Sequence, residues 1–229
     1  MLFRSCYAYN DRMVQRSIRE MTEFLERDFN HPCIVAWVPV NESWGVRQVW
    51  ANEKQQHYVQ MMLHLLKAMD HTRLVNGNDG WEQVSQTDFC TVHDYTLMPH
   101  NTQKYADLER ALDGIVEQRI VFASGHRYQG QAVVLSEYGG IAFRGEKDEE
   151  WGYYGKVDSE EAFFARLEPV TDYVIQSGQF AGFCYTQLTD VMQEANGLLT
   201  QDRRPKVELK RLKKIFSKSI RGEREANQR

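Results

Sequence analysis

Short apolar runs rich in β-branched residues alternate along the chain with longer segments in which apolar residues recur at helical spacing. The short runs lack the polar alternation of half-exposed strands, which is typical of strands buried on both faces of a parallel sheet. This alternation predicts an α/β fold in which helices cover the sheet. The expected strands are Ile34 to Val40, Leu74 to Asn78, Phe89 to Tyr95, Ala132 to Tyr138 and Ala181 to Gln187.

Helical periodicity fills the segments around these strands, with apolar residues spaced by about one turn. Asn10 is expected to cap the first helix, and Ser159 and Gly178 to begin and end the fourth, which Pro169 should kink. The helical patterns run over Val14 to Leu25, Tyr58 to Met69, Tyr105 to Ile115, Phe163 to Val174, and Val207 to Ile220.

The composition fits a single soluble globular domain, since 42% of the 229 residues are hydrophobic. The net charge of -4 gives no electrostatic reason to expect nucleic acid or an anionic membrane as partner. The N-terminus shows no signal-peptide pattern, and no apolar run is long enough for a membrane helix, so a cytoplasmic location is expected.

Two glutamates follow expected strands, and the carboxyl ends of parallel strands are where α/β proteins gather reactive side chains. Glu42 follows the run IVAWVPV, and Glu137 ends the run AVVLS. Hydrolysis of a glycosidic bond needs two carboxyl groups, one to protonate the leaving oxygen and one to attack the anomeric carbon or activate water. A single glutamate at a strand end is more often a structural hydrogen-bond partner, but the pair favours glycosidase chemistry.

Three segments resemble motifs of the family-2 glycoside hydrolases, which include β-galactosidases, β-glucuronidases and β-mannosidases. Residues 27 to 43, RDFNHPCIVAWVPVNES, resemble the acid/base signature, and LSEYGG at 135 to 140 resembles the nucleophile segment. NGLLTQDRRPK at 196 to 206 resembles the segment that closes the barrel. The resemblance covers about residues 10 to 216 and implies a (β/α)8 TIM-barrel catalytic domain.

The resemblance also implies a double-displacement mechanism with retention at the anomeric carbon. Glu137 would be the nucleophile that forms a glycosyl-enzyme intermediate, and Glu42 the acid/base. Retaining glycosidases hold these two carboxyl groups about 5–5.5 Å apart.

Further residues have counterparts in substrate binding, each with a plainer structural alternative. Asn41 matches the residue that binds the sugar 2-hydroxyl, or it only caps the following turn. Tyr95 falls near a tyrosine that hydrogen-bonds the nucleophile, or it is a rim aromatic. Tyr185 matches an aromatic platform on which the sugar ring stacks, although related enzymes often carry tryptophan there.

His93 and Asp94 are residue types that ligate divalent metals, but a lone pair without other spaced ligands favours sugar binding or packing instead. No metal and no cofactor are therefore expected. Trp44 and Trp81 follow strands and either line the substrate site or pack.

One departure from the family bears on the sugar. β-Glucuronidases carry an Asn-x-Lys motif for the substrate carboxylate, and the matching positions here are Glu194, Ala195 and Asn196. Without that lysine a glucuronidase is disfavoured, and a β-galactosidase-like specificity for a terminal β-D-glycoside is the default.

A second departure concerns length, because family members have further domains and three barrel strands ahead of the region that this chain matches. We therefore expect residues 1–221 to form a barrel truncated to its last five strands, followed by a flexible polar tail at 222–229. The open sheet edges would favour homo-oligomers or other self-association, and the isolated chain is expected to be a weak catalyst. The alternative is an inactive remnant that serves as a carbohydrate-binding or assembly module.

Overall fold

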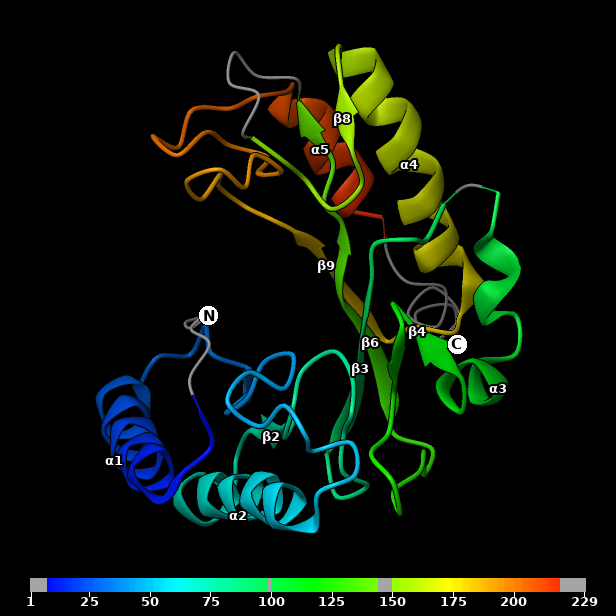
Figure 1. Ribbon diagram of the computed structural model, residues 1–229. Helices are drawn as coiled ribbons and strands as arrows, with labels where there is room; N and C mark the ends of the chain where they lie inside the picture. Colours follow the sequence, from blue (N-terminus) through cyan, green and yellow to red (C-terminus); the bar gives the residue numbers. More distant parts are fainter. Residues whose placement is uncertain (1–7, 99, 144–149, 219–229) are drawn as a thin grey trace, which may run out of the picture. The chain divides into compact units, whose positions relative to one another are not determined.

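A computed structural model describes residues 8–98, 100–143 and 150–218 (Figure 1). The chain divides into two compact units, which are described separately. The first unit comprises Met1–Val92 and Glu109–Val133, and the second comprises His93–Leu108 and Val134–Arg229.

Two helices supply half of the buried core residues of the first unit, and both confirm the sequence prediction. In α1 (Asp11–Asp28) the Asn10 side chain accepts a hydrogen bond from the backbone N–H of Met13 at 2.9 Å, as expected for an N-cap. In α2 (Glu53–Met69) Asn52 has the same role. The two helices contact one another, and the buried core comprises Leu25, Trp37, Val40, Val46, Val49, Tyr58, Val59, Met62, Leu63, Leu66, Val75 and Val84.

Strand β1 (Ala36–Trp37) pairs in parallel with β2 (Leu74–Val75) and is much shorter than the predicted run from Ile34 to Val40. Pro39 has no N–H to donate to a ladder, which accounts for the early end of the strand. The parallel pairing resumes as an isolated bridge between Asn41 and Asp79. This bridge fixes the chain at the point where Glu42 follows.

The prediction of one helix from Tyr105 to Ile115 is wrong. The segment instead contains the 3-10 turn η1 (Thr102–Tyr105) and the short helix α3 (Leu108–Leu112). The helix α3 ends two residues before Gly114, a residue type that is unfavourable inside a helix.

After Gly114 the chain forms a hairpin that the sequence analysis missed. Strand β4 (Ile115–Val116) pairs antiparallel with β5 (Arg119–Ile120). The two connecting residues, Glu117 and Gln118, both have positive φ values, of 50° and 63°, as a type I′ turn requires. Type I′ turns usually contain Asn and Gly. The Glu-Gln pair found here is atypical, so the sequence did not indicate a hairpin.

A three-stranded sheet has the order β3 (Phe89–Asp94), β6 (Ala132–Gly139), β9 (Gly182–Thr186), and the second unit contains β9, most of β6 from Val134 and the end of β3 from His93. Strands β6 and β9 are parallel, with Val134 opposite Gly182 and Gly139 opposite Thr186. All three strands were predicted within a residue or two of these bounds.

Two helices belong to this unit. In α4 (Glu160–Ser177) the Ser159 hydroxyl caps the first turn at 3.1 Å, and Gly178 ends the helix in the left-handed conformation, both as predicted. The last helix, α5 (Leu209–Phe216), starts two residues later than predicted, and the predicted end at Ile220 lies outside the described residues. A short parallel pair, β7 (Ala142–Phe143) with β8 (Lys156–Val157), was not predicted.

The five predicted strands are therefore present as β1, β2, β3, β6 and β9, and helices separate them along the chain except between β2 and β3. Within the described part of the chain, no helix has the length and apolar character needed to cross a bilayer.

Candidate active site

Glu42 lies on a tight turn directly after the bridge between Asn41 and Asp79. Its backbone N–H donates to the Asp79 carbonyl at 3.0 Å, and the N–H of Trp44 donates back to the Asn41 carbonyl at 2.9 Å. Glu42 and Ser43 have φ values of 52° and 57°, in the left-handed region that side chains other than glycine seldom adopt. Such a conformation persists only where the surroundings fix it.

The side chain of Glu42 is half-buried and has an aromatic neighbour. The indole Nε1 of Trp44 donates to Glu42 Oε2 at 3.4 Å, and the guanidinium of Arg47 lies 4.8 Å from the centre of the Trp44 ring. A donor therefore lies beside this carboxyl group, and a cation lies over the ring of that donor. Trp44, expected either to line the substrate site or to pack, contacts the Glu42 side chain.

Glu137 belongs to β6 and lies in an irregularity of that strand. From Leu135 to Tyr138 strand β6 advances three residues, whereas β9 advances two, from Phe183 to Tyr185. The extra residue is a β-bulge, a feature that re-aims a side chain next to many active sites. The Glu137 side chain is only 8% exposed.

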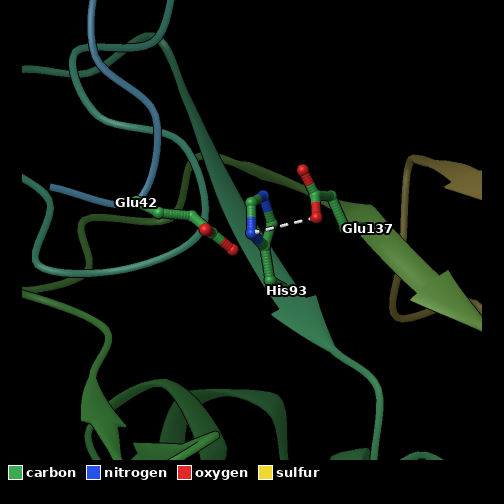
Figure 2. Close-up of side chains that lie close together, drawn as sticks. All are labelled: Glu42, His93 and Glu137. Atoms are coloured by element: carbon green, nitrogen blue, oxygen red, sulfur yellow. Dashed lines mark ion pairs between the residues drawn. The ribbon is translucent and has the colours of Figure 1, made fainter. Parts of the chain in front are cut away.

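Two side chains from the end of β3 hold Glu137. The Tyr95 hydroxyl donates to Glu137 Oε2, the contact that the sequence resemblance implied. His93 and Glu137 point toward one another (Figure 2), with His93 Nδ1 3.6 Å from the same Oε2. Burial and the negative charge of Glu137 raise the pKa of Tyr95 well above its ordinary value, so this hydroxyl keeps its proton and remains a donor.

His93 and Asp94 point in opposite directions, as neighbours on a strand do. The buried carboxylate of Asp94 accepts hydrogen bonds from the Thr96 N–H at 2.9 Å, Lys104 Nζ at 2.7 Å and the Tyr105 hydroxyl at 2.7 Å. Asp94 thus fixes the loop that carries Tyr95.

The Gly-Gly pair of the nucleophile motif has a steric explanation. Both glycines have positive φ, 87° at Gly139 and 60° at Gly140. A Cβ at Gly139 would lie 2.3 Å from the Tyr185 ring, and one at Gly140 would lie 2.9 Å from the Tyr95 ring. The glycines therefore allow two tyrosines to approach the backbone beside Glu137. Tyr95 in turn stacks on Tyr153, with ring centres 3.9 Å apart.

Tyr185 is packed inside the second unit. The residue is 9% exposed, its ring lies edge-on to Tyr138 and Phe163, and its hydroxyl accepts from the Ile141 N–H at 3.2 Å. This environment fits the packing role and leaves little of the ring for a stacked sugar.

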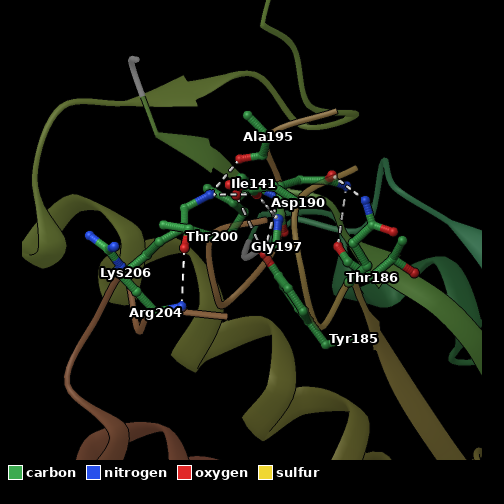
Figure 3. Close-up of polar contacts among 11 residues, drawn as sticks. Ile141, Tyr185, Thr186, Asp190, Ala195, Gly197, Thr200, Arg204 and Lys206 are labelled. Carbon is green, nitrogen blue, oxygen red and sulfur yellow. Dashed lines mark hydrogen bonds and ion pairs between the residues drawn. The ribbon is translucent and has the colours of Figure 1, made fainter. Parts of the chain in front are cut away.

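The third motif forms a loop tied to the end of β9 (Figure 3). Asp190 accepts from the Gly197 N–H and from Lys206 Nζ, each at 2.8 Å, and Lys206 also donates to the Ala195 carbonyl at 2.8 Å. Asn196 is fully buried, with its Oδ1 3.2 Å from Gln187 Nε2. The Lys206 ammonium group thus helps to hold the loop.

Sequence reasoning did not identify the polar residues beneath the Glu42 turn. Ser43, Asn78, Glu82 and Arg119 form a hydrogen-bonded network there, and Arg119 also lies 5.6 Å over the ring of Trp81. Hydrogen-bonded partners in this network are as many as 39 positions apart in the sequence, so no local sequence pattern indicates that they associate.

Comparison with known proteins extends the family resemblance. The family described as glycosyl hydrolases family 2, TIM barrel domain, matches residues 3–220. A β-glucuronidase of Pongo abelii is 26% identical over 210 residues, which are 86% of this chain and 31% of that protein.

Solved structures show the same fold. A family-2 β-galacturonidase from Eisenbergiella tayi bound to galacturonate matches with a TM-score of 0.65 and 17% identity, over 90% of this chain and 37% of that one. A β-D-glucuronidase of Dictyoglomus thermophilum matches with a TM-score of 0.62 and 19% identity, over 95% and 38%. The chain thus spans about a third of the length of these relatives. The match over residues 3–220, on this fold, shows that the chain belongs to glycoside hydrolase family 2 and forms part of its TIM barrel domain.

Proposed function

We propose that this protein is a retaining β-glycosidase that cleaves terminal β-D-galactoside-like bonds, with Glu137 as nucleophile and Glu42 as acid/base. The observation that carries the proposal is the environment of Glu137, a buried carboxylate on a β-bulge that accepts a hydrogen bond from Tyr95. A donor that cannot readily lose its proton favours the ionised carboxylate, and a nucleophile must be ionised.

In the first step the Glu137 carboxylate attacks the anomeric carbon, and the bond from that carbon to the leaving oxygen breaks. The leaving oxygen takes the carboxyl proton of Glu42. In the second step the Glu42 carboxylate takes a proton from water, whose oxygen attacks the anomeric carbon and releases Glu137. The product keeps the β configuration, and both carboxyl groups return to their starting protonation states.

Asn41 is our candidate for binding the sugar 2-hydroxyl. Its Oδ1 is buried and, among the described residues, has no hydrogen-bond partner. A buried acceptor of this kind costs free energy unless a ligand donates to it. Together with His93, Trp44 and Trp81 we propose Asn41 as substrate-binding; Tyr185 would support the site by packing.

The choice of a neutral sugar rests on the loop after β9. Asn196, at the position that resembles the uronidase lysine, is buried and bonded to Gln187, and the Lys206 ammonium is bound by Asp190 and the Ala195 carbonyl. Neither side chain offers a cation to a sugar carboxylate. Glu194, also buried, would repel one.

A β-uronidase is the second candidate, because the relatives named above act on glucuronides or galacturonides by their names. The two candidates share a mechanism and differ in the charge of the sugar.

The test compares 4-nitrophenyl β-galactoside, β-glucuronide and β-galacturonide, with proton NMR of the first sugar released. The proposal expects the highest kcat/KM for the galactoside and a β-anomer that appears before mutarotation. Faster release from a uronide would replace the sugar assignment, and an α-anomer first would overturn the retaining mechanism.

If the folded protein releases no aglycone from any of the three, the proposed activity fails. Binding of the same sugars, measured by calorimetry, would then favour the carbohydrate-binding module.

A further inference from the structure

The turn that carries Glu42 is held by side chains beneath it. Glu42 and Ser43 both adopt left-handed backbone conformations, so the turn would relax if left alone. The contacts that prevent this involve Ser43, which is almost completely buried.

Ser43 is bound to Asn78 through two reciprocal hydrogen bonds. The Ser43 N–H donates to Asn78 Oδ1 at 3.0 Å, and Asn78 Nδ2 donates to the Ser43 hydroxyl oxygen at 3.0 Å. The same Nδ2 also donates to the Trp81 carbonyl at 2.8 Å. Asn78 thereby joins the Glu42 turn to the loop after β2.

The Ser43 hydroxyl donates in turn to a buried carboxylate, Glu82 Oε2, at 2.6 Å. The other oxygen of Glu82 accepts from Arg119 Nη1 at 2.9 Å, and the Glu82 side chain is 3% exposed. A buried carboxylate needs a charged partner such as Arg119, because the free energy lost on removing the carboxylate from water exceeds the free energy gained from one neutral hydrogen bond.

The β4–β5 hairpin fixes Glu82 through its backbone as well. The Glu82 N–H donates to the Ile120 carbonyl at 2.9 Å, next to Arg119 in the sequence. Glu82 itself has a φ of 50°, a third non-glycine residue in the left-handed region within this network. One hairpin therefore sets both the position and the charge partner of the residue that binds Ser43.

We infer that Glu82, clamped by Arg119, is a positioning residue that sets the orientation of the Glu42 carboxyl group through Ser43. The inference rests on the proposed role of Glu42 as acid/base. Glu82 does not touch the reacting atoms, so its effect should fall on the step that needs a proton delivered to the leaving group.

The test uses the purified protein and two substitutions of one residue. Glu82→Ala removes both contacts, and Glu82→Gln keeps the shape and one acceptor. Asp88→Asn is the matched control, because Asp88 is a carboxylate of the same unit whose partners are Lys67 and the Val75 N–H rather than residues of the Glu42 turn.

Two readouts separate positioning from general stability. Amide hydrogen exchange at Ser43 should be faster in Glu82→Ala, intermediate in Glu82→Gln and unchanged in Asp88→Asn. The kcat for a phenyl glycoside, which needs protonation, should fall about 10- to 100-fold in Glu82→Ala, with a several-fold smaller effect on the 2,4-dinitrophenyl glycoside and little change in KM.

Unchanged exchange at Ser43 would overturn the inference, as would equal losses on the two glycosides. If the wild-type protein hydrolyses neither, the proposed function fails, and the exchange data alone decide whether Glu82 fixes the turn.

Discussion

Glu42 lies on a turn outside any strand and keeps a half-exposed side chain, whereas Glu137 lies within β6 and is almost fully buried. The first is fixed through its backbone, by the Ser43, Asn78 and Glu82 network. The second is fixed at its carboxylate, by the Tyr95 hydroxyl.

The difference suits the two proposed roles. An acid/base changes its protonation state twice in each cycle, so fixing its backbone while leaving the carboxyl group accessible preserves its proton exchange. A nucleophile must stay ionised and must point at the anomeric carbon, so permanent hydrogen-bond donors to its oxygens are an advantage. The following predictions test this comparison, from the largest expected effect to the smallest.

Glu137→Gln should lower kcat about 10⁴- to 10⁶-fold, because an amide cannot attack the anomeric carbon. The measurement is release of 4-nitrophenol under saturating substrate. Glu168→Gln, on the surface of α4, is the control and should keep wild-type activity. Activity within ten-fold of wild type in Glu137→Gln would remove Glu137 as nucleophile.

Glu42→Ala should lower kcat for a phenyl glycoside about 10²- to 10⁴-fold, since general acid–base assistance is lost. The loss should be much smaller for a 2,4-dinitrophenyl glycoside, whose leaving group needs no proton. Added azide should restore turnover and yield a β-glycosyl azide, because azide attacks without a base. No azide product, with equal losses on both glycosides, would contradict the acid/base role.

Gly139→Ala should destabilise the fold by about 2–5 kcal/mol, because the added Cβ meets the Tyr185 ring in a left-handed backbone. Gly178→Ala is the matched control, since Gly178 has a φ of 70° and no atom within 4 Å of an added Cβ. It should cost only about 1 kcal/mol. Urea unfolding measures both values, and equal losses would show that the tyrosine packing contributes nothing.

Tyr95→Phe should lower kcat about 10- to 100-fold, which corresponds to the roughly 1.5–3 kcal/mol of a hydrogen bond to a charged group. The variant keeps the ring that stacks on Tyr153, so the thermal midpoint should change little. Wild-type kcat in this variant would mean that the hydroxyl does not support the nucleophile.

The stability of the second unit should depend on alkaline pH. Burial raises the pKa values of Tyr95, Tyr138 and Tyr185 above that of a tyrosine in the unfolded chain. The folded form then holds protons that the unfolded form has lost, so this stabilisation is complete below about pH 10 and declines above it, by at most about 1.4 kcal/mol per pH unit for each tyrosine. Urea unfolding from pH 8 to 11 measures the slope, and Tyr95→Phe should make it shallower; an identical slope would contradict the assignment.

Much of the fold could be predicted from the sequence because its signals are local. Buried apolar runs marked all five main strands, and the caps at Asn10 and Ser159 marked two helices. The hairpin at Glu117 and Gln118 could not be predicted, since neither residue is typical of its turn type. The wrong prediction of a helix from Tyr105 to Ile115 relied on the spacing of apolar residues alone. Gly114, which disfavours a helix, was the signal in the sequence against it.

For the candidate site, the strand-end argument proposed Glu42 and Glu137, and the family resemblance anticipated the contact between Tyr95 and Glu137. The network through Glu82 and Arg119 could not be predicted from the sequence, because it joins residues that only the tertiary fold brings together. The same reason explains why the burial of Tyr185 could not be foreseen.

The central claim is that Glu137 is the nucleophile of a retaining glycosidase, and covalent trapping tests it most directly. The protein is incubated with 2-deoxy-2-fluoro β-glycosides that carry a good leaving group, and its intact mass and peptide map are recorded. We predict one added glycosyl group, located on Glu137 and absent from Glu137→Gln. A folded protein that acquires no adduct from any of the sugars, or that carries it on another residue, would contradict the account.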